Sequence, residues 1–239
     1  MKYGVFFLLF FLIFDSAALA ETGPGHPKGV VLLHGLARSA SSMKKMEKAL
    51  QAAGYQTLNI DYPSTSHPVE VLCRDHVAPK VNAFSKATGG SLAFVTHSMG
   101  GIVLRYLVKE GLIETPHSAV MLSPPNQGSE TVDKLGGLRL FKLINGPAGN
   151  QLGTGPDQLP ATLGPVTFPL GILTGTRTIN FILSALIPGP DDGKVAVARA
   201  PVAGMADFRA IPATHPFIMK NRTAIEETLG FLEKGRFSE

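Results

Sequence analysis

The segment that most constrains the fold is a short apolar run near the start of the chain, residues 30–34, with the sequence VVLLH. Gly29 precedes the run, Gly35 follows it, and no polar residue interrupts it before His34. A strand with one face in solvent alternates between apolar and polar residues, whereas a strand buried on both faces does not. We therefore expect residues 30–34 to form a central strand of a parallel sheet.

The rest of the chain alternates between strand-like and helix-like segments. Further strands are expected at residues 55–60, 91–96, 118–122, 170–173 and 208–211, and from Val195 onward. Helices are expected at residues 42–53, 68–86, 100–109 and 219–232. This alternation is typical of an α/β fold with a mostly parallel central sheet flanked by helices. Because no repeat or boundary divides the chain, we expect a single domain over residues 21–239.

The first 20 residues have a different character. Lys2 precedes an apolar run at residues 5–14, and small residues ending in Ala18-Leu19-Ala20 follow it. This pattern is typical of a secretory signal peptide cut after Ala20, and the run is shorter than the roughly 18 residues that span a bilayer. We expect export to the periplasm or secretion, with an uncleaved N-terminal anchor as the alternative.

The charge pattern excludes one class of function. The 239 residues carry 22 Lys and Arg against 18 Asp and Glu, a formal net charge of +4. The basic residues form no dense run and few aromatic residues lie among them, so nucleic-acid binding is not expected. The small excess is compatible with weak attraction to anionic surfaces or substrates. Cys73 is the only cysteine, so no internal disulfide is expected.

One long segment breaks the alternation. Residues 136–165 are rich in glycine and proline and are too long for an ordinary connection. The segment is either a surface excursion without a role or a flap over the substrate site, since long loops in compact domains often carry function.

The most specific motif is VTHSMGG at residues 95–101, where an expected strand gives way to an expected helix. A serine on such a sharp turn adopts a strained backbone that exposes its hydroxyl above the sheet. Small neighbours are needed because strand and helix nearly touch, and Gly100 is one of them. Thr96 stands where the usual motif has its first glycine. We interpret Ser98 as a nucleophile.

A second motif, His34-Gly35-Leu36, follows the first strong strand. Attack on an acyl carbonyl develops negative charge on its oxygen, which two preorganised backbone N–H groups stabilise. The expected donors of this oxyanion hole are the amides of Leu36 and of Met99. His34 and Gly35 are expected to shape the loop, and His34 is not expected to act as the base.

A serine nucleophile needs a general base, and histidine is the natural choice near neutral pH. Around a serine on this kind of turn, the chain order is serine, acid, histidine. Of the seven histidines, only His117 and His215 follow Ser98, and only His215 leaves room for an acid and further strands. We therefore predict His215 as the base, in a loop before the last helix.

The acid that orients the imidazole is expected just before Val195. Asp191 and Asp192 both lie there, and either carboxylate would serve chemically. Asp192, next to the turn residue Gly193, is preferred, Asp191 remains open, and Asp207 is a more distant alternative. No cluster of histidine or acidic residues joins the pair, so no metal is expected.

In chain order, the His34 motif, the Ser98 motif, Asp192-Gly193 and the His215 loop resemble bacterial α/β-hydrolases of the small lipase or esterase type. The resemblance covers nearly all of residues 21–239. It implies a sheet of eight strands or slightly fewer, the triad Ser98–His215–Asp192, the oxyanion donors Leu36 and Met99, and a minimal cap or none. Residues 122–129 resemble a segment that borders the active site in lipase-like relatives.

Together with the expected signal peptide, the resemblance predicts an exported serine hydrolase that cleaves lipid-like or short-chain carboxylic esters without a cofactor, and we expect a monomer. Peripheral contact with a membrane or with lipid aggregates is compatible with it. Because a triad dictates acyl chemistry and not the acceptor, a thioesterase or acyltransferase is the first alternative. A non-catalytic binding protein on the same scaffold is the second.

Overall fold

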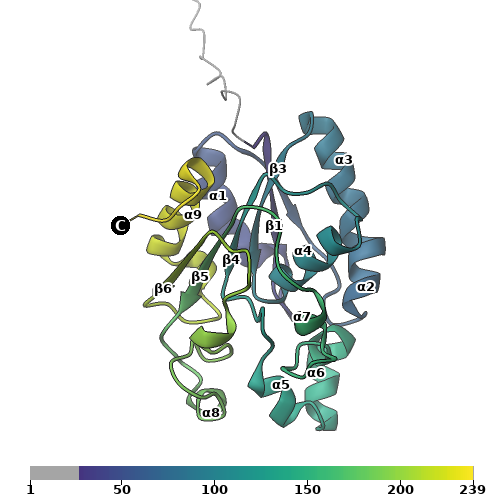
Figure 1. The fold of residues 1–239 in the computed structure, drawn as a ribbon, viewed down its shortest axis with the longest axis vertical. Coiled ribbons are helices and arrows are strands. Elements are labelled where there is room, and N and C mark those ends of the chain that lie inside the picture. The colour runs from purple at the N-terminus through teal and green to yellow at the C-terminus, as the bar shows by residue number, and fades with distance from the viewer. Residues whose placement is uncertain (1–26, 239) are drawn as a thin grey trace, which may run out of the picture.

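The structure is a computed structural model that describes residues 27–238, so the expected signal peptide lies outside the described residues. Six strands form one parallel sheet in the order β2-β1-β3-β4-β5-β6 (Figure 1). The strands are β1 (Gly29–Leu33), β2 (Gln56–Ile60), β3 (Leu92–His97), β4 (Ser118–Leu122), β5 (Leu170–Gly175) and β6 (Asp207–Ile211). The predicted α/β fold is confirmed, and residues 27–238 contribute six strands to the sheet where the resemblance implied up to eight.

The central strands are buried on both faces, as the run at residues 30–34 predicts. All five residues of β1 are buried, and alternate side chains enter two separate apolar cores. Val31 and Leu33 pack into one core, while Val30 and Leu32 pack into the other. Each fully buried aliphatic side chain contributes about 1.5–3 kcal/mol to folding, which explains why β1 lies inside the sheet, between β2 and β3, and not at its edge.

Helices cover both faces of the sheet (Figure 1). Side chains of α1 and α9 fill one core, and those of α2, α3 and α4 fill the other. The helices are α1 (Lys44–Ala52), α2 (Val69–Val71), α3 (Ala78–Thr88), α4 (Met99–Lys109), α5 (Glu130–Leu135), α6 (Arg139–Asn150), α7 (Leu159–Thr162), α8 (Phe181–Ser184) and α9 (Arg222–Lys234). None of them has the length and apolarity that a membrane span requires, within residues 27–238.

Two expected elements differ from the structure. The helix expected at residues 68–86 is interrupted by a π-helical stretch, Leu72–Val77, between α2 and α3. The strand expected from Val195 is wrong. Ala196 makes only an isolated antiparallel bridge to Asp191, and Val197–Arg199 form a 3-10 turn whose first amide donates to the Pro190 carbonyl over 2.9 Å. The segment closes on its own preceding loop and does not join the sheet.

Residues 136–165 are partly helical, since α6 and α7 lie within them. α6 is kinked at Gly146, which has φ 63° and precedes Pro147. The base of this excursion is held by the buried Arg105 of α4, which donates to the carbonyls of Pro160 and Gly164 over 3.2 and 2.7 Å. α5, α6 and α8 all project beyond the end of the sheet where the strands finish (Figure 1). Two helical arms, one formed by α5 and α6 and the other by α8, therefore extend past that edge of the sheet.

Candidate active site

Ser98 lies directly between β3 and α4, where the sequence placed it. Its backbone has φ 53° and ψ −125°, and its amide donates to the Leu122 carbonyl over 2.8 Å. Within residues 27–238, three non-glycine residues have positive φ, namely Ala37, Ser98 and Ser123, and they follow β1, β3 and β4. Such conformations cost about 1–3 kcal/mol each. The strain is therefore concentrated at the edge of the sheet that carries Ser98.

Two glycines allow the chain to pass close to Ser98. A Cβ atom on Gly100 would lie 2.6 Å from the carbonyl oxygen of Leu33, at the end of β1. A Cβ atom on Gly35 would lie 2.8 Å from Nδ1 of His97 and 3.0 Å from Cβ of Ser98. Any side chain at either position would push the loop after β1 away from the serine.

His215 and Asp192 meet Ser98 at this edge of the sheet. Nε2 of His215 lies 3.0 Å from Oγ of Ser98, and Nδ1 lies 2.8 Å from Oδ2 of Asp192. The backbone amide of His215 also donates to the Asp192 carbonyl over 2.9 Å. All three side chains are buried or nearly so. The structure thus brings together the three residues that the sequence proposed from distant positions.

The environment of Asp192 favours its ionised form. Burial works to raise the pKa of the carboxyl group, but the neighbouring His215 and hydrogen bonds to the carboxylate lower the pKa below its ordinary value. Among these bonds, the amides of Lys194 and Val195 donate to Oδ1 over 3.1 and 2.9 Å. Oδ2 is left for the imidazole, so the carboxylate holds one ring nitrogen of His215 as a donor.

Asp191, the alternative acid, has other partners. Its Oδ1 accepts from the Gly193 amide over 2.7 Å, and its Oδ2 accepts from Oγ of Ser184, at the end of α8, over 2.7 Å. Asp191 therefore anchors the α8 arm. Asp207 lies at the start of β6, the opposite end of that strand from His215.

His97 was not assigned a role from the sequence, and the structure gives it one. Its Nε2 donates to the carbonyl oxygen of His215 over 3.0 Å, and the two rings lie 5.0 Å apart. Burial, together with the neighbouring His215, lowers the pKa of His97 well below its ordinary value, so the ring is neutral. A neutral ring donates through one nitrogen only, and that nitrogen fixes the backbone of His215.

The loop after β1 carries the expected oxyanion donors. Met99 is the first residue of α4, so its amide has no acceptor inside the helix. The side chain of Leu36 lines the same cavities as Ser98. Both residues therefore lie beside the serine, where a substrate carbonyl oxygen would need two amide donors.

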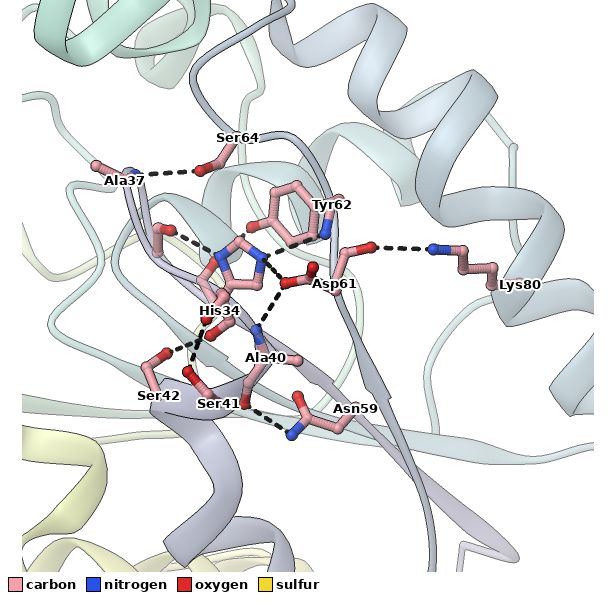
Figure 2. A network of polar contacts seen from close by, with 12 residues as sticks. His34, Ala37, Ala40, Ser41, Ser42, Asn59, Asp61, Tyr62, Ser64 and Lys80 are labelled. Atoms are coloured by element: carbon pink, nitrogen blue, oxygen red, sulfur yellow. Dashed lines mark hydrogen bonds and ion pairs between the residues drawn. The ribbon is translucent and has the colours of Figure 1, made fainter.

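His34 holds this loop in place (Figure 2). Its ring stacks on Tyr62 with 4.1 Å between ring centroids, its Nδ1 donates to the Gly35 carbonyl over 2.8 Å, and its Nε2 accepts from the Tyr62 amide over 3.3 Å. Desolvation lowers the pKa of His34, so the ring is neutral at pH 7. The Ala37 amide also donates to Oγ of Ser64 over 3.1 Å. These contacts tie the loop after β1 to the loop after β2, the shaping role that the sequence suggested.

A cleft of about 570 Å³ opens at Ser98. Its walls combine the α8 arm, the His215 loop and two basic side chains, and its lining residues are Leu36, Arg38, His97, Ser98, Ile179, Asn180, Phe181, Ile182, Leu183, Asp192, Gly193, Lys194, His215 and Pro216. A much smaller, mostly apolar cavity of about 20 Å³ on the α6 side shares Leu36, Ser98 and Lys194 with it. No group of three or more metal-ligating side chains is present in the described part of the chain.

Eight large apolar side chains around this end of the molecule are 52–82% exposed, and we call them the rim. They are Leu138, Leu140, Leu143 and Ile144 on or beside α6, Ile179, Phe181 and Ile182 on or beside α8, and Phe217 near His215. The buried residues Leu36, His97, Ser98, Asp192 and His215 are called the floor.

The parallel sheet, with a strained serine at the carboxyl end of its central strand, defines an α/β enzyme scaffold of the kind that carries nucleophilic serines. The chain belongs to the α/β-hydrolase family, whose model matches residues 30–228. No curated protein sequence matches the chain.

Solved structures share this fold at low sequence identity. The mature lipase of Bacillus licheniformis is 21% identical, with a TM-score of 0.71, and the match covers 87% of this chain and 93% of the lipase. Lipase B of Aspergillus fumigatus is 16% identical, with a TM-score of 0.65, and the match covers 92% of this chain but 55% of that enzyme. A metagenomic carboxyl esterase is 16% identical, with a TM-score of 0.61 and coverage of 89% and 80%.

Proposed function

We propose that this protein hydrolyses carboxylic esters through an acyl-enzyme on Ser98. The observation that carries the proposal is the continuous contact from Asp192 through His215 to Ser98, with 2.8 and 3.0 Å between the bonded atoms. A serine hydroxyl is a weak nucleophile until a neighbouring base takes its proton, and this arrangement supplies that base. Family membership and the similarity to lipases and esterases support ester chemistry.

In the proposed reaction, Oγ of Ser98 attacks the ester carbonyl carbon while Nε2 of His215 takes the hydroxyl proton. The amides of Leu36 and Met99 stabilise the negative oxygen that forms. His215 then gives the proton to the leaving alcohol, and the acyl group stays on Ser98. Water, activated by His215, releases the acid and restores the serine.

The test compares the wild type with Ser98→Ala on p-nitrophenyl esters from acetate to palmitate. We expect kcat to fall on the order of 10⁴- to 10⁶-fold in the variant, because no other group replaces the nucleophile. A fluorophosphonate probe should label the wild type at Ser98 and label His215→Ala far more slowly. Equal hydrolysis by wild type and Ser98→Ala would refute the proposal.

We also propose that the rim contacts lipid aggregates, which would make lipid-like esters the preferred substrates. Seven exposed apolar side chains on or beside α6 and α8, and an eighth near His215, are costly in water, and clusters of this kind mark interaction surfaces. Three of them, Ile179, Phe181 and Ile182, line the cleft, so a lipid surface bound there would lie next to Ser98. A smaller fraction of the protein should sediment with phosphatidylcholine vesicles in a Leu143→Ser, Ile182→Ser double variant than in the wild type. An unchanged fraction would refute the contact.

Export is proposed on the basis of residues 1–20 alone. The mature protein should begin at Glu21, which N-terminal sequencing of the secreted or periplasmic fraction checks. A chain that keeps Met1 and fractionates with membranes would support the uncleaved anchor.

A further inference from the structure

Two basic side chains enter the cleft without an acidic partner. Arg38 lies in the loop after β1, and Lys194 follows the Asp192-Gly193 turn, yet both line the cleft together with Ser98. Among residues 27–238, neither forms an ion pair with a carboxylate. The other side chains of the cleft supply one carboxylate, that of Asp192. The cleft therefore has an excess of positive charge beside the serine.

The position of Lys194 makes this charge costly. The side chain is half-buried and also lines the small cavity on the α6 side, so it stands where the two spaces meet at Ser98. Desolvation, together with the charge of Arg38, lowers the pKa of Lys194, and the opposite effect of the Asp192 charge does not offset this. The Asp192 carboxylate, however, is already bonded to His215 and to two backbone amides. A partly buried cation with no dedicated counter-ion is stabilised when a ligand brings one.

The wall that the α8 arm contributes is mostly apolar, with Asn180 as its one polar side chain. Ile179, Phe181 and Ile182 line the cleft from the α8 arm. A ligand that fills this cleft therefore meets hydrocarbon on one wall and two cations next to the nucleophile. An uncharged ester would leave both cations without a partner and would shield the half-buried Lys194 further from water, whereas Arg38 is exposed.

We propose that the cleft selects esters that carry a negative charge, a phosphate or a carboxylate, a few bonds from the scissile carbonyl, with Arg38 and Lys194 as the binding residues. This inference rests on the proposed ester hydrolysis at Ser98 and names the substrate class of that site. Guanidinium and ammonium groups both bind such anions, and the planar guanidinium does so with two parallel hydrogen bonds.

The experiment measures the ratio of kcat/KM for a charged and an uncharged ester. A substitution that damages the site in general lowers both values and leaves this ratio unchanged. Purified protein receives octanoyl glycerol or octanoyl glycerol phosphate, each below its micelle concentration, and the release of octanoate gives kcat/KM for each. We expect the wild type to prefer the phosphate ester. The ratio of the two kcat/KM values should fall about tenfold to hundredfold in Lys194→Gln and in Arg38→Gln, since a hydrogen bond to a charged group is lost.

Matched variants control for charge and for folding. Arg38→Lys keeps the charge and should retain most of the preference. Lys48→Gln removes an exposed lysine of α1, outside the cleft, and should leave the ratio unchanged. A second pair of esters, octanoyloxybutanoate and its neutral amide, separates a carboxylate from a phosphate, and a preference for either anion supports the inference. A wild type that prefers neither anion, or a ratio that both glutamine variants leave unchanged, would overturn it.

A labelling experiment separates this inference from the proposed function. Glycerol phosphate should slow the reaction of a fluorophosphonate with Ser98 in the wild type, but not in the Arg38→Gln, Lys194→Gln double variant. If Ser98 of the wild type is labelled equally fast with and without glycerol phosphate, anion recognition is refuted and the proposed hydrolysis is not affected. Absence of labelling at Ser98 would instead refute the hydrolase.

Discussion

The floor and the rim of the cleft are built on opposite principles. The floor residues are buried at the ends of parallel strands and in the loops that follow them, and their polar groups bond to one another. The rim consists of exposed apolar side chains on two short helical arms and beside His215. Buried, mutually bonded groups hold one geometry, whereas exposed apolar groups gain only when something covers them. The floor therefore suits a fixed reaction, and the rim suits the choice of what reaches it.

Two neighbouring residues show this division at the scale of one peptide bond. Asp192 accepts from the imidazole of His215, on the floor, while Asp191 accepts from Ser184, on the α8 arm. The floor and the rim are therefore joined within a single turn. Replacing Asp191 or Asp192 by asparagine, one at a time, separates the contribution of the rim to activity from that of the floor.

The largest expected effect comes from Asp192→Asn. The amide cannot hold the imidazole in the correct tautomer, so kcat on p-nitrophenyl butyrate should fall on the order of 10⁴-fold. Asp191→Asn is the matched control, and it should change kcat far less while weakening the attachment of α8. Steady-state kinetics of both variants check this, and equal losses would break the distinction between floor and rim.

A smaller effect is expected at His97. In His97→Phe the donor to the His215 carbonyl is lost, and a displaced base should lower kcat roughly 10- to 100-fold with little change in KM. His97→Gln offers an amide N–H in a similar place and should recover part of the loss. Because a merely structural fault would lower the melting temperature in both variants without this recovery, kinetics and thermal unfolding are measured together.

Two buried histidines, His97 of the floor and His34 beneath the loop after β1, also affect the acid stability of the protein. Burial lowers the pKa of His34 and His97, so the unfolded chain takes up protons just below pH 6.5 while the folded chain does not. Stability is therefore complete above that pH and falls below it, by at most about 1.4 kcal/mol per pH unit for each such histidine, until the pH reaches the pKa of the folded state. Urea unfolding from pH 7 to 5 measures the slope, and His97→Gln should make it shallower. A slope unaffected by the variant would contradict the neutral state of His97.

The smallest effect is expected at the rim. Ile182 is 82% exposed, so Ile182→Ser should leave stability within about 0.5 kcal/mol. Hydrolysis of p-nitrophenyl acetate should stay the same, and hydrolysis of emulsified long-chain esters should fall severalfold because less apolar surface meets the lipid. If both substrates are affected equally, the rim also positions the floor.

The parts of the molecule that the sequence predicted are those that local chemistry determines. The run at residues 30–34 can be satisfied only between two layers of helices, and a serine between a buried strand and a Gly-Gly helix start has one suitable turn. The choice between Asp191 and Asp192 was left open because both are carboxylates in one loop. The structure distinguishes them through the directions of their hydrogen bonds.

The features that the sequence missed depend on distant contacts. The segment from Val195 is as apolar as a strand, but its amide and carbonyl groups bond to the preceding loop. Helix α6 was hidden by Gly146 and Pro147, which interrupt its pattern at the kink. Arg38 and Lys194 are far apart along the chain, and nothing in their local sequence indicates that they share a cleft.

The positive φ angles of Ala37, Ser98 and Ser123 bear on how this protein could be made more heat-resistant. Glycine relieves such a conformation, so Ala37→Gly removes strain in the folded state, although it also gives the unfolded chain more freedom. The substitution would also loosen the loop that carries the Leu36 amide, so any gain in melting temperature would come with a lower kcat. Stabilising changes in α1 or α9, where no residue has a positive φ, carry no such conflict. A directed search for a tougher enzyme should therefore begin where the backbone is relaxed.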